Sequence, residues 1–419
     1  MKLAAGKLTR WILIGLGAGI VVGLIQYLTL PADVNAAIIK WVHNPLGVVF
    51  LNAIRLMVVP LVLVSLTLGT AAIGDLSKLG RIGGKTMGIY LTTTAIAISI
   101  GFILATTVHP GTNLDIPVEG DFQGGESPFV MDIITDIVPT NPVSSMAEGN
   151  MLQIIFFAIL AGLAIAKIGK KADPLMRGLE SLDQVIQAMV VLIMWYAPIG
   201  VFGLIAKVVA GEGFAVFVPL LKYMFCVVGA LAIHGLVIYP LYLMILTKLN
   251  PWRFYANIWP AMLVAFSTSS SNATLPVTMN VAGTRLGAKE SIYSFTLPLG
   301  ATINMDGTAI MQGVATVFIA NVYGIDLTLG NFLTVVMMAT LASIGTAGVP
   351  GVGLIMLSMV LTEIGLPIEG IGIILGVDRL LDMTRTSVNI AGDLMTTTVV
   401  AKSEGEFDVA RFLAANKPE

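Results

Sequence analysis

The sequence predicts an all-α polytopic membrane protein with eight transmembrane helices and two re-entrant helical hairpins. Of its 419 residues, 56% are hydrophobic and only 11% are charged, against about 25% charged residues in an ordinary soluble domain. Apolar stretches of the length that crosses a bilayer, about 20 helical residues, recur along the chain. Two further apolar stretches, in the C-terminal half, are interrupted by runs of small polar residues and glycine. We therefore expect one integral membrane unit and not a string of soluble domains.

Charge and cysteine content exclude several other classes of protein. The formal net charge of -2 excludes a basic nucleic-acid binder. The single cysteine, Cys226, lies in an apolar run and excludes a disulfide framework or a multi-cysteine metal site. The first apolar stretch follows three basic residues, as a signal peptide does, but it is longer than a signal core and more spans follow. We therefore expect an uncleaved first helix.

Six spans precede residue 255, at about 11–30, 45–74, 87–108, 129–168, 184–209 and 216–247. Basic residues follow the second, fourth and sixth spans, whereas the stretch 109–131 carries four acids and no Lys or Arg. Because cytoplasmic loops hold the excess of Lys and Arg, we expect cytoplasmic N- and C-termini in a multi-pass protein of the cell membrane. In the first span, Gly15, Gly19 and Gly23 form a small-residue stripe suited to close helix packing.

Beyond residue 255 the helical pattern is interrupted twice, first by the polar run Ser267–Asn272 and then by the glycine-rich run Ser343–Gly353. Irregular backbone at membrane depth is tolerated only where protein buries it or where it lines a cavity. We interpret both runs as tips of re-entrant hairpins. The alternative is a pair of unrelated loops that lie outside the membrane.

An apolar helix with an Asn and an Asp follows each hairpin, giving Asn304 and Asp306 after the first and Asn389 and Asp393 after the second. This is a weak internal repeat. A hairpin followed by a broken helix, occurring twice, is typical of secondary transporters that bind their substrates at the repeat interface.

The last segment, residues 370–400, collects charged and amide side chains on one face. As a helix stepping about 100° per residue, it places five of them within an arc of about 80°. A charge at the bilayer centre costs at least about 2.5 to 3.5 kcal/mol, so intramembrane charges face a partner or a water-filled site. A solvated surface helix is the alternative, but both flanks of the segment are apolar. The five residues are Asp378, Asp382, Arg385, Asn389 and Asp393.

The chemistry of this face suits an amino acid that carries a second carboxylate. Arg385 offers a planar fork of donors that matches a carboxylate, and Asp382 supplies the opposite charge for an ammonium group. Hydroxyls and amides of the first hairpin tip, around Ser270, Ser271 and Asn272, would hold the α-carboxylate. The alternative is that Asp382 and Arg385 neutralise each other at i,i+3 spacing.

The remaining acids suit hard cations such as Na⁺, which prefer oxygen ligands. Asp393, Asn389 and Asn304 would form one cage, completed by carbonyls near Gly300. Asp306 would form another with hydroxyls from the third span, a pairing that spacing alone does not establish. Those hydroxyls belong to Tyr90, Thr93 and Thr94.

Four motifs, in this order, resemble the dicarboxylate/amino acid:cation symporter family, the prokaryotic homologues of excitatory glutamate transporters, over nearly the whole chain. The motifs are Ser269–Pro276, Leu297–Thr308, Ser343–Gly351 and Asp378–Asp393. The resemblance implies a homotrimer in which each protomer has a scaffold and a transport domain that moves like an elevator. It places scaffold helices in 1–86 and 129–215, the third helix with the acidic external loop in 87–128, the sixth helix in 216–250, and both hairpins with helices 7 and 8 in 251–419.

The resemblance also implies individual roles for these residues. Asp382 would bind the substrate amino group, and Arg385, assisted by Thr308, the side-chain carboxylate. The second hairpin would be the gate. The rest of the substrate shell would be Ser270, Ser271, Gly348, Thr386 and Asn389. The three implied sodium sites are Gly300, Asn304, Asn389 and Asp393; Thr302, Ser343, Ile344 and Thr346; and Tyr90, Thr93, Thr94, Asn304 and Asp306.

Two departures from the family pattern concern charge. Asn272 stands where a third serine is common, and an extra arginine, which relatives tend to carry, is missing at both Ser269 and Met383. Both departures bear on the charge balance of the empty site and on any K⁺ counter-transport. The helical angle of Arg379 puts it beside the acidic face and not on it.

The sequence thus predicts a Na⁺-coupled symporter of L-aspartate or L-glutamate. The alternatives are a proton- or sodium-coupled carrier of C4-dicarboxylates or neutral amino acids and, from another class, an ion channel with a polar pore. An enzyme is not expected, because no nucleophile motif has a partner base. The three histidines, at His43, His109 and His234, are scattered along the chain.

Overall fold

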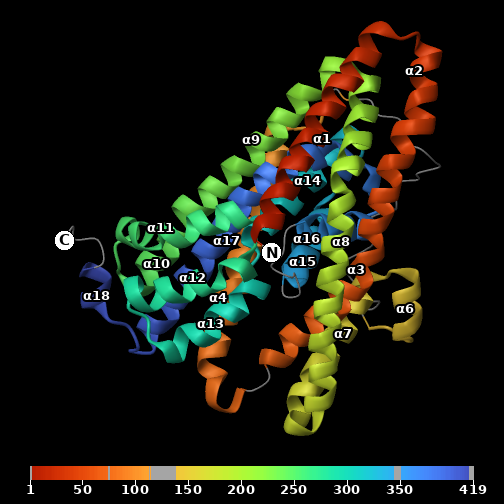
Figure 1. Ribbon diagram of the computed structural model, residues 1–419. Helices are drawn as coiled ribbons and strands as arrows, with labels where there is room; N and C mark the ends of the chain where they lie inside the picture. The colour runs from red at the N-terminus through yellow and green to blue at the C-terminus, as the bar shows by residue number, and fades with distance from the viewer. Residues whose placement is uncertain (1, 74–75, 113, 115–137, 344–350, 415–419) are drawn as a thin grey trace.

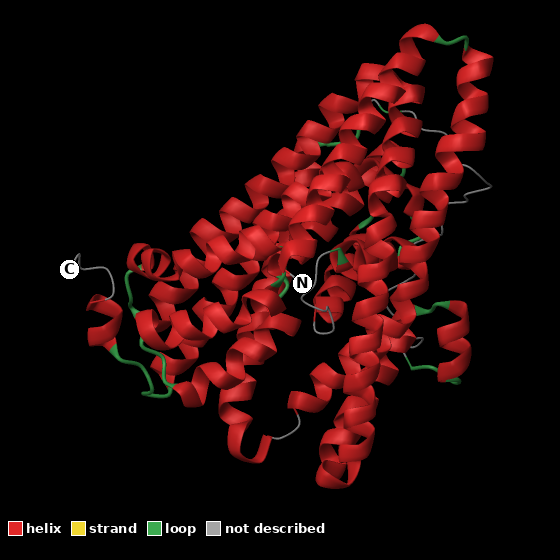
Figure 2. Cartoon of the chain, in the orientation of Figure 1, coloured by secondary structure: helices red, strands yellow, loops and turns green. Residues whose placement is uncertain are grey.

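The structure, a computed structural model, describes residues 2–73, 76–112, 114, 138–343 and 351–414. Within these ranges the chain is helical throughout (Figure 2), and its only extended pairing is an isolated antiparallel bridge between Ala288 and Phe407. The all-α prediction is confirmed.

The N-terminal half consists of long helices and short helical turns. They are α1 (Lys2–Thr29), α2 (Ala32–Ile38), α3 (Asn44–Ile73), α4 (Leu76–Val108), α6 (Pro142–Glu148), α7 (Met151–Ile168), α8 (Asp173–Glu212), α9 (Phe217–Ile233) and α10 (Tyr239–Thr247). Two π-helical turns, Ile39–His43 and His234–Ile238, interrupt the sequence of α-helices.

The C-terminal half has shorter helices before one long one. They are α11 (Pro251–Thr268), α12 (Ser271–Val281), α13 (Glu290–Ile303), α14 (Asp306–Val322), α15 (Leu329–Ser343), α16 (Val352–Glu363), α17 (Ile371–Ser403) and α18 (Val409–Ala414).

Helices α1, α3, α7 and α8 pack on one another as one group, with α1 running along α8 (Figure 1). The predicted glycine stripe makes this close approach possible. A Cβ atom at Gly15 would lie 2.3 Å from the Pro198 carbonyl oxygen, and one at Gly23 would lie 2.8 Å from the Cβ of Val209. Small residues let helix backbones approach in this way.

A second group surrounds α17, which packs against α10, α11, α13 and α14 (Figure 1). Helix α4 joins this group through α14, where glycines again face the opposing backbone. A Cβ at Gly101 would lie 2.7 Å from the Ile310 carbonyl oxygen, and one at Gly313 would lie 2.8 Å from that of Ile98. Most residues of α17 are buried, so its charged face lies inside the protein.

Four described stretches are long and apolar enough to cross a membrane: Arg10–Thr29, Ala32–Ala71, Arg81–Val108 and Gln153–Thr247. Large apolar side chains on these stretches face outward, including Leu192, which is 70% exposed, and Phe225, which is 65% exposed. Such faces suit lipid or a second protein surface.

Two of the predicted helices differ in detail from the structure. The predicted fourth span, 129–168, is interrupted in its described part, because Gly149 ends α6 with a φ of 74° and Asn150 caps the start of α7. The second helix of the repeat is not broken, since α17 continues through Asn389 and Asp393 to Ser403. Only the first helix of the repeat, between Ile303 and Asp306, is interrupted.

Both predicted hairpins have helices that pack against each other, α11 with α12 and α15 with α16. In the first, Ser269 adopts a left-handed conformation with a φ of 49°, and the Ser270 hydroxyl caps α12 by accepting from the Ala273 N–H. The tip of the second hairpin, with the predicted site residues Ile344, Thr346 and Gly348, lies outside the described residues.

Candidate functional site

The unwound segment between α13 and α14 is seated on α17. Asn304 and Met305 have non-helical backbone angles, and the Asn389 side-chain oxygen accepts a hydrogen bond of 2.7 Å from the Gly307 N–H. A Cβ at Gly307 would lie 2.6 Å from the Arg385 carbonyl oxygen, so the close approach requires glycine there. The break predicted from the Asn-Met-Asp-Gly motif is confirmed, and it brings one predicted ion-binding segment against the predicted substrate face.

Arg385 is the centre of a buried charge network on α17. Its Nη1 donates to Asp378 at 2.7 Å and its Nη2 donates to Asp382 at 2.9 Å. The side chain is 1% exposed, and its Nε finds no hydrogen-bond partner among the described residues. The mutual neutralisation of Asp382 and Arg385 is therefore present, but Asp378 takes part in it and the Nε nitrogen of the guanidinium is left without a partner among the described residues.

Arg379 also reaches this network, although its position on the helix is beside the acidic face. Its Nη1 lies 3.5 Å from the Asp382 Oδ2, and the residue is buried. The long arginine side chain spans the angular offset that the backbone position implies. Two arginines and two aspartates thus balance in charge. Asp378, Arg379 and Asp382 line a narrow cleft whose remaining lining is apolar and comes from α1, α3, α8, α17 and the start of α16.

Thr308 and Gly353 lie next to the Arg385 guanidinium. A Cβ at Gly353, in the first turn of α16, would be 3.2 Å from the Thr308 Cγ2 and 3.7 Å from the Arg385 Nη2. The first turn of α14 and the start of the second hairpin's returning helix therefore meet at the arginine. Thr386, also in the predicted substrate shell, donates to the Asp382 carbonyl at 2.8 Å.

The tip of the first hairpin is buried and internally bonded. Ser269, Ser270 and Ser271 all have low exposure, and the Thr274 hydroxyl donates to the Ser270 carbonyl at 2.8 Å. The N–H groups of the first turn of α12 follow directly after Ser270. Such a helix N-terminus favours an anionic group.

The first predicted cation cage is assembled around Asn304. Its Nδ2 donates to the Asp393 Oδ1 at 2.9 Å and to the Asn389 carbonyl at 3.1 Å. Its Oδ1 is buried and accepts no hydrogen bond from the described residues. Gly300 completes the group, because only the absence of a Cβ lets the Asp393 carboxylate approach its backbone.

The Asp306 carboxylate, which has no exposed surface, is the centre of the third predicted cage. Its Oδ1 accepts from the Thr94 hydroxyl at 2.6 Å. Tyr90 and Thr93, from the same turn of α4, are also buried, but the Tyr90 hydroxyl donates to the Thr296 carbonyl at 3.1 Å. The pairing of Asp306 with this turn of α4 is therefore present through Thr94.

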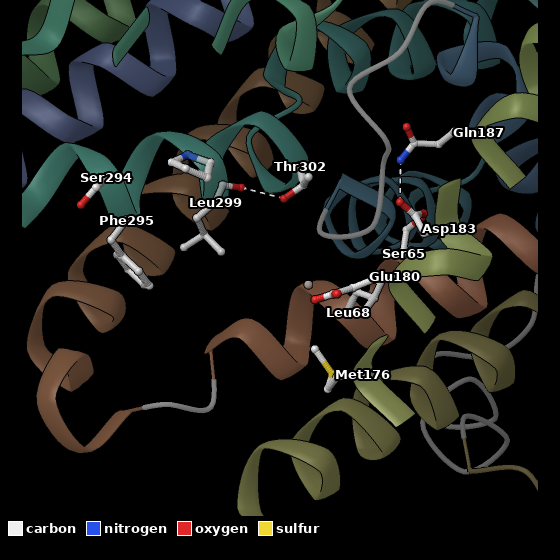
Figure 3. A pocket seen from close by; sticks show the side chains of 12 residues that line it. Ser65, Leu68, Met176, Glu180, Asp183, Gln187, Ser294, Phe295, Leu299 and Thr302 are labelled. Atoms are coloured by element: carbon white, nitrogen blue, oxygen red, sulfur yellow. Dashed lines mark hydrogen bonds between the residues drawn. The ribbon is translucent and has the colours of Figure 1, made fainter. Parts of the chain in front are cut away.

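The remaining cage, around Thr302 and Ser343, is not closed in the described part of the chain. The Thr302 hydroxyl donates to the Leu299 carbonyl at 3.0 Å, and the Ser343 hydroxyl donates to the Thr340 carbonyl at 2.8 Å. Thr302 instead lines a cavity of about 420 Å³ between α3, α8 and α13 (Figure 3). Among the predicted site residues that the structure describes, only Thr302 lines this cavity. We place the site at α17 because the buried charges are there.

Two residues of the Asp306 cluster, His234 and Tyr239, were not found by sequence reasoning. The His234 Nε2 lies 3.0 Å from the Asp306 Oδ2, and the Tyr239 hydroxyl donates to the same oxygen at 2.8 Å. A signal was present in the sequence, because the sixth span contains a histidine, His234, and one turn and a half later a proline, Pro240. A proline in a helix interior disturbs the backbone hydrogen bonds of the preceding turn.

The chain matches the model of the "Sodium:dicarboxylate symporter family" over residues 8–403. It is 36% identical over 426 residues to the proton/glutamate-aspartate symporter of Escherichia coli K12, covering 99% of this chain and 97% of the relative. It is 36% identical over 421 residues to the proton/sodium-glutamate symport protein of Bacillus subtilis, covering 98% and 96%. A C4-dicarboxylate transport protein of Bacillus subtilis is 34% identical over 420 residues, covering 98% and 97%.

Proposed function

Because the chain belongs to the sodium:dicarboxylate symporter family, as its four motifs predict, we propose that it is a Na⁺-coupled secondary active symporter of acidic amino acids. The family consists of transporters and not of enzymes. The substrate class is a dicarboxylate or acidic amino acid, in agreement with the names of its relatives. L-Aspartate or L-glutamate, Na⁺ as the coupling ion, and the roles of individual residues belong to the proposal.

The observation that carries the substrate assignment is the buried Arg385 with two aspartate partners and a spare Nε donor. A substrate carboxylate replaces Asp382 at Nη2 and takes the free Nε as its second donor, which gives the bidentate geometry that arginine favours. Asp382 then keeps only the more distant Arg379, at 3.5 Å, and the substrate ammonium group replaces the cation it has lost. A substrate that carries both a carboxylate and an ammonium group keeps the buried charges around Arg385 and Asp382 balanced, whereas a substrate with only one of these groups would not.

The cation assignment rests on Asp393 and Asn304. Asp393 is buried, and no basic side chain pairs with it in the described part of the chain. A buried carboxylate without a partner is costly, and the unpaired Asn304 Oδ1 beside it is an oxygen of the kind that Na⁺ binds. One Na⁺ at Gly300, Asn304, Asn389 and Asp393 would satisfy both needs, and another would bind at Asp306.

We further propose that the protein is a homotrimer of the cell membrane with cytoplasmic termini and an elevator mechanism. Residues 1–86 and 129–215 would form the scaffold, and 87–128, 216–250 and 251–419 would carry the site across the membrane. The packing of α1, α3, α7 and α8 on one another, and of α4 and α10 to α14 around α17, supports this division. The second hairpin, whose returning helix α16 starts beside the Arg385 guanidinium, would be the gate.

A carrier of C4-dicarboxylates is the second candidate, and the name of one relative favours it. Such a substrate has no ammonium group, so it would leave Asp382 without a new partner. The coupling ion is a second question, because a proton bound to Asp393 would neutralise its charge as a bound Na⁺ would. The substrate class and the coupling ion are therefore tested separately.

Purified protein in liposomes should accumulate labelled L-aspartate only under an inward Na⁺ gradient. Uptake that a proton gradient drives equally well without Na⁺ would refute the coupling ion. Competition by succinate as strong as by unlabelled aspartate would favour the C4-dicarboxylate carrier.

Asp382→Asn should abolish aspartate uptake. Asp183→Asn should not, although Asp183 is also a half-buried acid of a long helix, bonded to Ser65 and Gln187. An Asp382→Asn variant with normal aspartate uptake would refute the assignment of the ammonium partner.

A further inference from the structure

The sixth apolar segment contains a π-helical turn, His234–Ile238, between α9 and α10. The Tyr239 N–H donates to the His234 carbonyl, an i,i+5 bond that adds one residue to the turn. The two side chains therefore lie next to each other, with ring centroids 4.5 Å apart and the rings edge to face at an interplanar angle of 69°. Turns of this kind are rare and occur frequently at functional sites.

The turn directs both side chains at one oxygen of Asp306. The Asp306 Oδ2 accepts from the His234 Nε2 at 3.0 Å and from the Tyr239 hydroxyl at 2.8 Å, whereas Oδ1, among the side chains that the structure describes, accepts from the Thr94 hydroxyl alone. An ionised carboxylate only accepts, so both groups donate to it. With Oδ2 fully engaged, the plane of the carboxylate is set and Oδ1 keeps a free lone pair.

All the residues of this arrangement are buried, and its surroundings are closely packed. His234 and Asp306 have no exposed surface, and Tyr239 is 1% exposed. Gly392 of α17 makes room for Tyr239, because a Cβ there would lie 2.4 Å from the Tyr239 hydroxyl and 2.6 Å from the Asn304 Nδ2. Tyr239 therefore stands between Asp306 and the Asn304 cage.

The backbone of the turn is held from outside as well. The Tyr255 hydroxyl of α11 donates to the Gly235 carbonyl, which the irregular turn leaves accessible. Tyr255 comes from the first hairpin, so the turn is clamped between that hairpin and α17. The need to accommodate Pro240 would explain an irregular turn, but it would not explain why a buried histidine in that turn contacts Asp306.

We infer that His234 and Tyr239 are positioning residues for cation binding at Asp306, and that they set the Na⁺ affinity of that site without touching the ion. They orient the carboxylate so that Oδ1 faces the cation. This inference rests on the proposed Na⁺ coupling. Outer-shell partners of this kind are typically worth about 10- to 100-fold in metal affinity.

The test measures labelled aspartate uptake as a function of Na⁺ concentration, and aspartate binding at saturating Na⁺, for Tyr239→Phe, His234→Leu and His234→Gln. Tyr239→Phe and His234→Leu should raise the Na⁺ concentration for half-maximal uptake by about 10-fold or more. Aspartate affinity and melting temperature at saturating Na⁺ should stay within about twofold and a few degrees of the wild type. His234→Gln keeps a donor and should recover most of the loss.

Matched controls are available in another part of the molecule. His43→Gln changes a buried histidine that contacts Gln26 at 3.1 Å, and Tyr196→Phe removes a hydroxyl that contacts the Leu46 carbonyl at 3.4 Å. Neither should alter the Na⁺ dependence.

The outcomes separate this inference from the proposed function. A wild type that ignores Na⁺ would overturn both. A Na⁺-dependent wild type whose Tyr239→Phe variant has the same Na⁺ curve would overturn this inference alone, and so would a loss of maximal rate without any change in Na⁺ dependence. Tyr239→Phe removes a single oxygen and carries the test if His234→Leu fails to fold.

Discussion

Gly300→Ala is the sharpest single test of the Asn304 cation cage. The added Cβ would lie 2.4 Å from the Asp393 Oδ1 and 2.4 Å from the Tyr90 hydroxyl, whereas real Cβ contacts are essentially never under 3.0 Å. Both polar groups must therefore retreat by more than half an ångström. A binding site tolerates displacements of only about 0.5 Å, so we expect the apparent Na⁺ affinity to fall by about 10- to 100-fold.

The helix itself should gain from the same change, because alanine is favoured over glycine in a helix interior by about 1 kcal/mol. Na⁺-dependent aspartate binding to the purified protein, followed together with its melting temperature without Na⁺, separates the two effects. Gly88→Ala in α4 is the control, since a Cβ there meets nothing within 4 Å. Equal Na⁺ affinity in the wild type and Gly300→Ala would refute the cage.

Three further predictions concern charges. Arg385→Lys keeps the charge but loses the planar fork, so the KM for aspartate should rise at least about tenfold; an unchanged KM would count against the bidentate role. Arg81 and Lys85 hold the pKa of Glu404 below its usual value, so the stability that the Glu404 carboxylate contributes is present above the usual Glu pKa and is lost as pH falls through the depressed value. The melting-temperature difference between wild type and Glu404→Gln should therefore shrink toward acidic pH, and a constant difference would contradict this origin. The exposed pair of Arg55 and Glu369, 2.8 Å apart, should be worth at most about 1 kcal/mol, so exchanging the two charges should leave the uptake rate within about fivefold.

The parts of the site that follow from local pattern were predictable from the sequence. The face of α17 follows from helical periodicity, because residues 378, 382 and 385 keep their relative angles in any α-helix. The break at Asn304 follows from a polar motif with glycine inside an apolar run. The caps of α6 and α7 were also readable, since Asn141 precedes a proline and Asn150 follows a glycine, but hydropathy alone joined them into one span.

The parts that depend on long-range packing were not predictable. His234 and Tyr239 meet Asp306 across about 70 residues of chain, and a π-helical turn shifts the register that a 3.6-residue period assumes. The contact of Arg379 with Asp382 is missed for a related reason, because an angular projection treats every side chain as having the same length. A flexible arginine reaches a partner that its Cα position does not face.

The geometry of α17 limits how strongly cations and substrate attract each other directly. Arg385 and Asp393 are eight residues apart on one helix, or about 12 Å along its axis. At an effective dielectric constant of about 20, two unit charges at that distance attract by about 1.4 kcal/mol, which is about tenfold in affinity. Any larger coupling must pass through contacts that both sites share.

Asn389 makes such shared contacts. Its side chain holds the Gly307 N–H beside Arg385, and its carbonyl accepts from Asn304 in the cation cage. Asn389→Ala should therefore reduce the effect of Na⁺ on aspartate affinity to about tenfold, the factor that direct electrostatic attraction supplies. Because coupling is reciprocal, the dependence of Na⁺ affinity on aspartate should fall by the same factor. An Asn389→Ala variant that keeps a larger, unchanged coupling would show that the contact between the unwound segment and α17 does not carry it.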